Sequence, residues 1–334
     1  MFDIITFGSA TRDMFLKSGE FKAVAQKKFI TEQGLCISLG SKIPVEDLEF
    51  ATGGGGTNPA ATFALQGFKI AYCGKVGGDM GGRAIIEELE NLGINTKLVV
   101  RDKNCKTNYS VVLSVPGKER TILVYRDASE KLIPAEIPWK KLKTKWFYVS
   151  PLSGKLVKIF NPLISFARKN NIKVFLNPGN TQLSLPKKVW LPILKTIDIL
   201  MLNQEEAALL SGIPYKKEKE IFERLDGWTK GIVVMTRGPF GPVVSDGKFR
   251  YSAGCLKERK LIDRTGAGDA FGSGFLTGFI KSKGDIAYAI QFGSANATGC
   301  IEKFGAKSGI LKKGESIYQR GHLQIERGKV KSKK

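Results

Sequence analysis

The chain has 334 residues, 42% of them hydrophobic, and Lys and Arg outnumber Asp and Glu by 53 to 31, a net charge of +22. This length suits one large α/β domain with a small addition, and the apolar fraction excludes a wholly disordered chain. The charge permits a polyanionic partner. However, the basic residues are spread out, with one dense run at 327–334 that we expect to be a frayed tail. No zinc-finger spacing or arginine-rich recognition segment occurs, so we do not expect a nucleic-acid partner.

The five cysteines lie far apart and form no C-x-x-C pair, which predicts free thiols in a reducing compartment. The N-terminal residues lack the basic and long apolar regions of a signal peptide. No stretch approaches the ~20 apolar residues that span a bilayer. We therefore expect a cytoplasmic protein without a membrane partner. The single histidine, His322, lies in a polar stretch near the C-terminus, so acid–base chemistry is expected to fall to a carboxylate.

Short apolar runs alternate with helix-length segments along most of the chain. Strands are predicted at 3–8, 70–74, 146–150, 172–176, 198–202 and 231–235, and helices at 58–66, 81–92, 155–170, 187–195, 204–211 and 218–229. This alternation predicts an α/β fold in which helices cover both faces of a mostly parallel sheet.

Residues 12–50 and 97–126 interrupt this alternation with β-like patterns, including a hairpin across Pro116-Gly117. We expect both segments to build one small sheet, a lid over the ends of the main strands. No low-complexity linker divides the chain, so residues 1–334 are predicted to form a single domain.

A Gly-rich turn runs directly into an apolar helix at Asp263-Arg-Thr-Gly-Ala-Gly-Asp269. The turn presents free backbone N–H groups and the positive end of the helix dipole, which together make an anion site. Asp269, at the helix start, can accept a proton from a nucleophile that attacks the bound anion, as phosphoryl transfer requires. An isolated segment of this kind is also typical of an ordinary helix cap. A dinucleotide motif is excluded because position 271 is Phe, and no P-loop motif occurs.

This segment resembles the C-terminal signature of the ribokinase-like (PfkB) sugar and nucleoside kinases, and the resemblance covers essentially the whole chain. It implies a three-layer α/β/α fold with a β-sheet lid, ATP as the phosphoryl donor and Mg²⁺ as a cofactor. It also implies that Asp269 is the general base and that Gly266, Ala267 and Gly268 form the anion hole.

Two segments near the N-terminus resemble the family's substrate-binding motifs. Gly53-Gly-Gly-Gly-Thr-Asn58 resembles the Gly-Gly signature, which implies that Gly54, Gly55 and Asn58 contact the substrate and that the glycines hinge the lid. Asp13 matches the family Asp that accepts hydrogen bonds from substrate hydroxyls. Gly55 stands where ribokinases proper usually carry Lys, which argues against simple ribose as the acceptor.

Segments in the second half resemble the nucleotide and metal motifs of the family. Asn203-Gln-Glu-Glu206 matches its N-x-x-E, which implies that Asn203 and Glu206 hold Mg²⁺ and its waters. Asp263 and Thr265 match positions of a monovalent-cation site, which would take K⁺, although Arg264 replaces the usual Thr. The nucleotide contacts that the resemblance implies are Asn203, Thr236, Gly238, Gly241, Asn296 and Gly305.

The sequence leaves the acceptor open between hypotheses. Basic lid residues favour a sugar or sugar phosphate: Lys106, Arg120 and Arg126, with Arg120 as the candidate ligand. Aromatic lid residues would suit the base of an adenosine-like nucleoside: Phe15, Tyr109 and Tyr125. A third reading, an inactive nucleic-acid-binding relative, is opposed by the intact anion turn and Asp269. Exposed edges of the lid would favour a homodimer through it.

Overall fold

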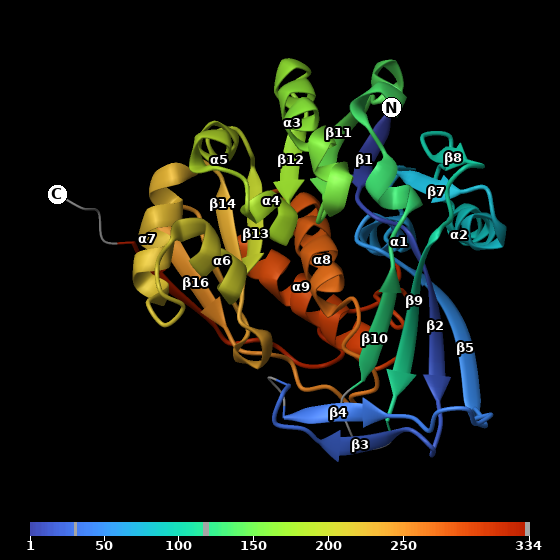
Figure 1. Cartoon of the computed structure of the whole chain (residues 1–334). Helices are drawn as coiled ribbons and strands as arrows, with labels where there is room; N and C mark the ends of the chain where they lie inside the picture. Colours follow the sequence, from blue (N-terminus) through green and yellow to red (C-terminus); the bar gives the residue numbers. More distant parts are fainter. Residues whose placement is uncertain (30–31, 116–119, 331–334) are drawn as a thin grey trace.

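In the computed structural model, residues 1–29, 32–115 and 120–330 are described, and they form a large α/β body with a smaller sheet beside it (Figure 1). The predicted turn at Pro116-Gly117 and residues 331–334 of the predicted tail lie outside these ranges. The five cysteines are free, as the sequence predicts. Within the described ranges, no helix is both long and apolar enough to cross a membrane.

The body is built on a large sheet that, within the described residues, has nine strands in the order β17-β16-β15-β14-β13-β12-β11-β1-β6. Six of them pair in parallel, close to the six predicted runs: β1 (Phe2–Phe7), β6 (Ile70–Cys73), β11 (Thr144–Val149), β12 (Lys173–Leu176), β13 (Ile199–Asn203) and β14 (Ile232–Thr236). The other three extend the sheet in antiparallel fashion: β15 (Pro242–Ser245), β16 (Phe249–Ala253) and β17 (Ile325–Lys329).

Two layers of helices cover this sheet, which confirms the predicted three-layer architecture (Figure 1). One layer holds α1 (Thr57–Leu65), α2 (Met80–Asn91), α8 (Ala267–Lys281) and α9 (Ile286–Ile301); the other holds α3 (Phe160–Lys169), α4 (Asn180–Leu183), α5 (Lys187–Leu194), α6 (Gln204–Ser211) and α7 (Glu218–Trp228). Successive side chains of a strand enter opposite layers. In β11, Phe147 and Val149 pack under α3, whereas Trp146 and Tyr148 pack under α1 and α8.

Short 3₁₀ helices connect several of these elements: Ala128–Lys131, Pro134–Glu136, Trp139–Lys141, Gly154–Ile159 and Gly238–Phe240. The helix predicted at 155–170 is divided, because its first part is the 3₁₀ helix Gly154–Ile159 and α3 begins only at Phe160. Pro162 explains this start, since a residue without an N–H group is tolerated in the first turn of an α-helix but not in its interior.

The lid is a separate four-stranded sheet in the order β10-β9-β2-β5. Its strands come from both predicted segments: β2 (Thr11–Lys17), β5 (Asp47–Gly53), β9 (Asn108–Ser114) and β10 (Thr121–Tyr125). A hairpin of β3 (Lys22–Ala25) and β4 (Gln33–Cys36) adjoins it. The prediction is wrong for residues 97–107, because β8 (Val100–Asp102) pairs with β7 (Lys75–Gly77) and not with the lid.

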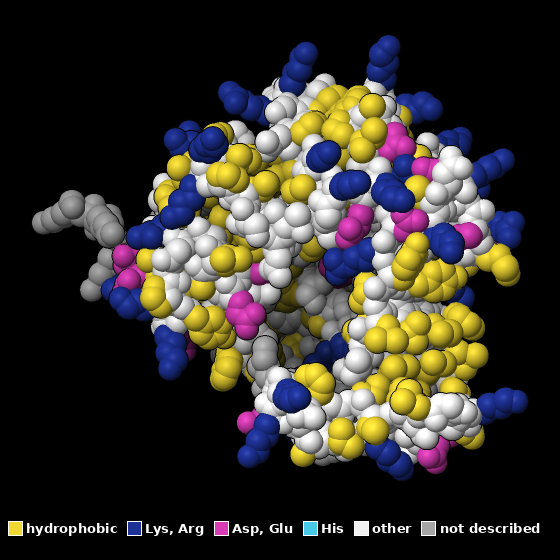
Figure 2. Space-filling view, in the orientation of Figure 1, with side chains coloured by type: hydrophobic (Ala, Val, Ile, Leu, Met, Phe, Trp, Pro, Cys, Tyr) yellow, Lys and Arg dark blue, Asp and Glu magenta, His cyan; other side chains and the backbone are white. Residues whose placement is uncertain are grey.

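The outer face of the lid exposes apolar side chains, seen as a yellow group at the lower right of Figure 2. Leu48, Phe50 and Leu123 share this face by their register and are each more than half exposed. The homodimer through the lid stays a prediction. Lys and Arg are scattered around the visible surface of Figure 2 without one dense patch, and a hollow separates the lid from the body.

The C-terminal basic run was predicted to be a frayed tail, but the part of it that the structure describes begins in a strand. Residues 325–329 form β17, the edge strand that pairs with β16 from Ala253 to Phe249. The guanidinium carbon of Arg327 lies 3.6 Å from the centroid of the Phe249 ring. A ladder of backbone hydrogen bonds and this cation–π contact therefore order residues whose composition alone resembles a mobile tail.

Candidate active site

The candidate site lies where the parallel strands end, below the lid. The chain leaves β13 at Asn203 and β14 at Thr236, and these two residues are paired in register. The N-terminal half of α8 covers the same region, since a methyl group at Gly272 would touch both Tyr148 of β11 and Met201 of β13. Ligands of open α/β sheets bind at this carboxyl edge of the strands.

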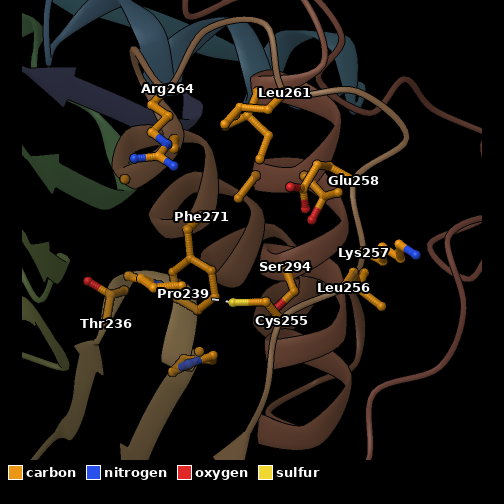
Figure 3. A pocket seen from close by; sticks show the side chains of 18 residues that line it. Thr236, Pro239, Cys255, Leu256, Lys257, Glu258, Leu261, Arg264, Phe271 and Ser294 are labelled. Atoms are coloured by element: carbon orange, nitrogen blue, oxygen red, sulfur yellow. Dashed lines mark hydrogen bonds between the residues drawn. The ribbon is translucent and has the colours of Figure 1, made fainter. Parts of the chain in front are cut away.

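A cavity of about 560 Å³ opens here between the end of β14, the segment after β16, the start of α8 and the C-terminal half of α9 (Figure 3). Residues predicted as nucleotide or anion contacts line it: Thr236, Gly238, Gly241, Ala267 and Gly268. Most of its remaining wall is apolar and includes Leu256, Leu261, Phe271 and Ile301. A mostly apolar cavity that reaches a helix N-terminus suits a ligand with an apolar part and an anionic part.

Asp269 lies in the first turn of α8. Burial raises the pKa of its carboxyl group to about 6, and the hydrogen bond from Asn58 opposes this shift. That bond runs from Asn58 Nδ2 to Asp269 Oδ2 over 2.8 Å and joins α1 to α8. A carboxylate with this pKa is ionised at neutral pH yet basic enough to accept a proton during a reaction.

The turn before Asp269 depends on glycine. Gly266 is the N-cap of α8, has a φ of 77°, and leaves room for Ala306, whose Cβ would lie 2.2 Å from a Cβ at position 266. The Ala267 N–H group makes a long bond of 3.3 Å to the carbonyl of Arg264. The next amides, of Gly268 and Asp269, precede the helical hydrogen-bond ladder and suit an anion in the adjacent cavity.

Asp263 holds this turn in place from its other end. Its Oδ1 accepts hydrogen bonds from the Thr265 amide (2.9 Å) and the Thr265 hydroxyl (2.7 Å), and its Oδ2 accepts one from the Gly305 amide (3.2 Å). The guanidinium Nη1 of Arg120 lies 3.4 Å from Oδ1. Both oxygens are thus engaged and a permanent cation stands beside one of them, so Asp263 and Thr265 do not fit the K⁺ site that the sequence implies.

Three of the six predicted nucleotide contacts do not line the cavity: Asn203, Asn296 and Gly305. The Gly305 amide is buried against Asp263, and Asn296 is fully buried where it bonds Thr62, the carbonyl of Ala270 and the amide of Leu311. The assignment of Gly305 and Asn296 as direct contacts is wrong. Gly305 follows α9 and packs on Asp263, and sequence spacing did not reveal which face of α9 meets the cavity. The residues of α9 that do line it share one helical face: Ser294, Ala297, Thr298 and Ile301.

The sequence also missed the segment after β16, which forms one side of the cavity in Figure 3 with Cys255, Leu256, Lys257, Glu258 and Leu261. This segment carries no motif. The three-to-four-residue spacing of small residues in α9 could have indicated its lining face; nothing comparable marks residues 255–261.

The predicted substrate residues gather on the lid side of Asp269. The Cβ of any residue at position 53 would lie 2.2 Å from Asp13 Oδ2, so Asp13 packs against the start of the Gly53–Gly56 turn. Gly54 has a φ of 105° and would bring a Cβ to 2.4 Å from the carbonyl oxygen of Ser9. Gly55 follows, with its carbonyl accepting a hydrogen bond from Ser150.

Asp13 and Asn58 are polar groups buried at this position. Burial raises the pKa of Asp13 to about 6, while a hydrogen bond with Ser110 and the charge of Lys307 oppose the shift. Asn58 Oδ1 is buried and, among the described residues, has no hydrogen-bond partner. A buried amide oxygen without a partner is costly unless a ligand or water supplies the donor, so Asn58 is suited to a bound hydroxyl group.

Asn203 and Glu206 form a reciprocal cap at the start of α6. Asn203 Oδ1 accepts from the Glu206 amide and Glu206 Oε2 accepts from the Asn203 amide, each over 2.8 Å. Burial raises the pKa of Glu206. No cluster of three or more His, Cys, Asp or Glu able to hold a metal occurs in the described part of the chain. One carboxylate and an amide oxygen nevertheless fit Mg²⁺, which keeps several waters and binds nucleotide phosphates.

The comparisons agree with this geometry. The model of the pfkB family carbohydrate kinases matches residues 23–313. A ribokinase of Haemophilus influenzae is 28% identical over 289 residues, covering 83% of this chain and 90% of the relative. A cytidine kinase of Thermococcus kodakarensis is 27% identical over 268 residues, covering 76% and 88%.

Solved structures share the fold. The structure of Arabidopsis thaliana ribokinase complexed with ribose and ATP has a TM-score of 0.76 at 19% identity and covers 96% of this chain and 98% of its own. The family match extends over nearly the whole body and part of the lid, with the anion turn and Asp269 inside it. The chain therefore belongs to the pfkB family of carbohydrate kinases and is a phosphotransferase.

Proposed function

We propose that this protein transfers the γ-phosphoryl group of ATP to a hydroxyl group of a sugar, with Asp269 as the general base. The observation that carries the proposal is the placement of Asp269 at the N-terminus of α8, beside the cavity and within 2.8 Å of Asn58. Its pKa of about 6 keeps it ionised at the pH of a cell interior.

In this proposal, Asn58 and Asp13 hold hydroxyl groups of the acceptor, and Asp269 takes the proton of the attacking hydroxyl. The Gly266–Gly268 turn stabilises the negative charge that develops on the transferred phosphoryl group. The nucleotide would lie in the cavity along Thr236, Gly238 and Gly241. Mg²⁺ bound with the nucleotide would neutralise phosphate charge, and Glu206 with Asn203 are the residues that would hold it, through water.

We propose a sugar rather than a sugar phosphate because two of the three basic side chains considered as phosphate ligands are engaged elsewhere and the third, Lys106, lies outside the lid sheet. Arg120 pairs with Asp263, and Arg126, which is 55% exposed, pairs with Glu130. A phosphate on the acceptor would need arginine or lysine groups directed at it. The role of Arg120 as a direct substrate ligand stays a prediction.

A nucleoside is the second candidate, favoured by one observation. Asp13 and Phe15 lie two residues apart in β2 and so share one face of the lid. Phe15 is buried and its ring packs edge-on against Phe304, with 6.3 Å between centroids. This aromatic pair could support a base next to the hydroxyl-binding residues. The name of the Thermococcus relative, a cytidine kinase, is consistent with this candidate.

The test is ATP consumption by the purified protein with a panel of sugars, sugar phosphates and nucleosides, with Asp269→Asn in parallel to identify contaminating kinases. Turnover with a sugar that is lost in the variant would support the proposal. Turnover with nucleosides alone would favour the second candidate. A panel in which only sugar phosphates react would contradict the assignment of a neutral acceptor.

A further inference from the structure

The lid touches the body at the segments that shape the anion turn. Phe15 of β2 packs on Phe304, and Lys307 hydrogen-bonds Thr52 of β5. Arg120, the residue before β10, reaches Asp263. Two lid strands and the residue before a third thus meet two short segments, 263–266 and 304–307, which themselves contact each other where Ala306 packs against Gly266.

Arg120 and Asp263 form the charged part of this contact. Only 4% of the Asp263 side chain and 26% of the Arg120 side chain are exposed. Breaking a pair in which one charge is buried costs far more than losing a surface pair, because the buried partner is left uncompensated. The carboxylate of Asp263 therefore depends on a cation, and the lid supplies it.

Hydrogen bonds to Thr265 connect Asp263 to the Gly266–Gly268 turn. Its Oδ1, the oxygen beside Arg120, accepts the two hydrogen bonds from Thr265, which immediately precedes the N-cap glycine of α8. Its Oδ2 accepts from Gly305 in the second lid-contacting segment. A shift of this carboxylate moves the Gly266–Gly268 turn, and displacement of catalytic groups by about 1 Å can cost 10²-fold in rate.

We propose that Arg120 is a positioning residue that couples closure of the lid to the shape of the anion turn, in the place of an added monovalent cation. Docking of the lid brings the guanidinium to Asp263, which then holds Thr265 and the turn in their catalytic arrangement. Opening of the lid moves the Arg120 guanidinium away from Asp263 and loosens the Gly266–Gly268 turn. Arginine suits this role because it stays protonated at all relevant pH values and its planar fork loses little freedom on pairing. The inference rests on the proposed function for its kinetic consequence, but its structural part does not.

The first test is hydrogen exchange of peptides covering residues 262–270, without nucleotide, in the wild type, Arg120→Gln and a matched control. Arg101→Gln serves as the control because Arg101 is an exposed residue of β8, outside the lid. We expect exchange in these peptides to rise on the order of 3- to 10-fold in Arg120→Gln and to stay unchanged in the control. Unchanged exchange in Arg120→Gln would overturn the proposal.

A double-mutant cycle separates coupling from general destabilisation. In an Asp263→Asn background, Arg120→Gln should add little further exchange, because the two side chains act through one contact. Equal and additive effects of the two substitutions would refute the coupling.

The kinetic test uses whichever acceptor the panel identifies. In the wild type, replacing K⁺ by tetramethylammonium should change kcat by less than about twofold, since Arg120 already provides the cation. Arg120→Gln should lower kcat by roughly 10-fold or more while KM for ATP changes little, and Arg120→Lys should restore part of kcat. A several-fold activation of the wild type by K⁺ would overturn the proposal. If no acceptor reacts, the proposed function fails while the exchange tests still decide the coupling.

Discussion

Replacing Asp269 by Asn should sharply lower kcat and stabilise the protein at the same time. The substitution keeps the shape of the side chain and an oxygen that can accept the hydrogen bond from Asn58, which is 2.8 Å away. It removes the proton acceptor, so kcat should fall by roughly 10²–10⁴, the range for a lost general base.

The expected gain in stability follows from the buried charge. Burial raises the pKa of Asp269 from 3.8 to about 6, which means that ionisation is less favourable in the folded state than in the unfolded chain. Each pKa unit corresponds to 1.36 kcal/mol, so the ionised carboxylate destabilises the fold by about 3 kcal/mol at pH 8. At a pH below the pKa of the unfolded chain, Asp269 is protonated in both states and does not destabilise the fold. This stability is lost as the pH rises from about 4 to about 6, because the carboxyl group then ionises more readily in the unfolded chain. Asp269→Asn should therefore gain about 3 kcal/mol at pH 8 and about half of that at pH 5.

The assay is thermal unfolding at several pH values together with steady-state kinetics. With an unfolding entropy of about 2.1 cal/mol/K per residue, 3 kcal/mol corresponds to a rise in Tm of roughly 4 °C for a chain of this length. Asp47→Asn is the control, since Asp47 is exposed at the start of β5 and should change neither Tm nor kcat. Near-normal turnover of Asp269→Asn would refute its role as the base. A Tm at pH 8 that equals or falls below the wild-type value would refute the reasoning from burial.

Three further outcomes are expected. Gly266→Ala should lower Tm and reduce kcat/KM at least about 10-fold, because its positive φ and the 2.2 Å approach to Ala306 exclude a side chain; an unchanged variant would contradict the geometry of the turn. Since Asp13 and Asp269 both have a pKa near 6 and both must be ionised, log(kcat/KM) should fall below pH 6 with a slope approaching 2, and a limb centred near pH 4 would be inconsistent with burial. Glu206→Gln should raise the Mg²⁺ concentration needed for half-maximal activity by about 10-fold; an identical magnesium titration would remove Glu206 from the metal site.

Local chemistry that is confined to short segments could be predicted from the sequence. The strand–helix alternation correctly gave the parallel part of the sheet, because buried parallel strands are short, continuous apolar runs. The Gly-rich turn followed by Asp269 was recognisable since a left-handed cap and a free helix N-terminus each have a sequence signature. The cavity residues Thr236, Gly238 and Gly241 were implied by the family resemblance of the segment after β14.

Features that depend on how distant segments meet could not be predicted. Asn296 looked like a nucleotide contact, but the rotation of α9 turns it into the core between α1 and α8. Residues 327–329 looked like part of a tail, but they belong to the strand that completes the sheet edge through β16. In both cases the deciding contacts join segments far apart in the sequence, and neither composition nor periodicity specifies such a partner.

The sequence by itself predicted the fold class, the pfkB resemblance and Asp269 as the candidate base, since each rests on short local segments of the chain. Only the tertiary structure decided which charges meet. Arg120 lies 143 positions from Asp263 and reaches it because the lid folds back onto the body, a contact that no local pattern records. The raised pKa values of Asp13 and Asp269 also depend on the tertiary structure. Burial is their largest cause, and these side chains are buried only once the lid, α1 and α8 surround them.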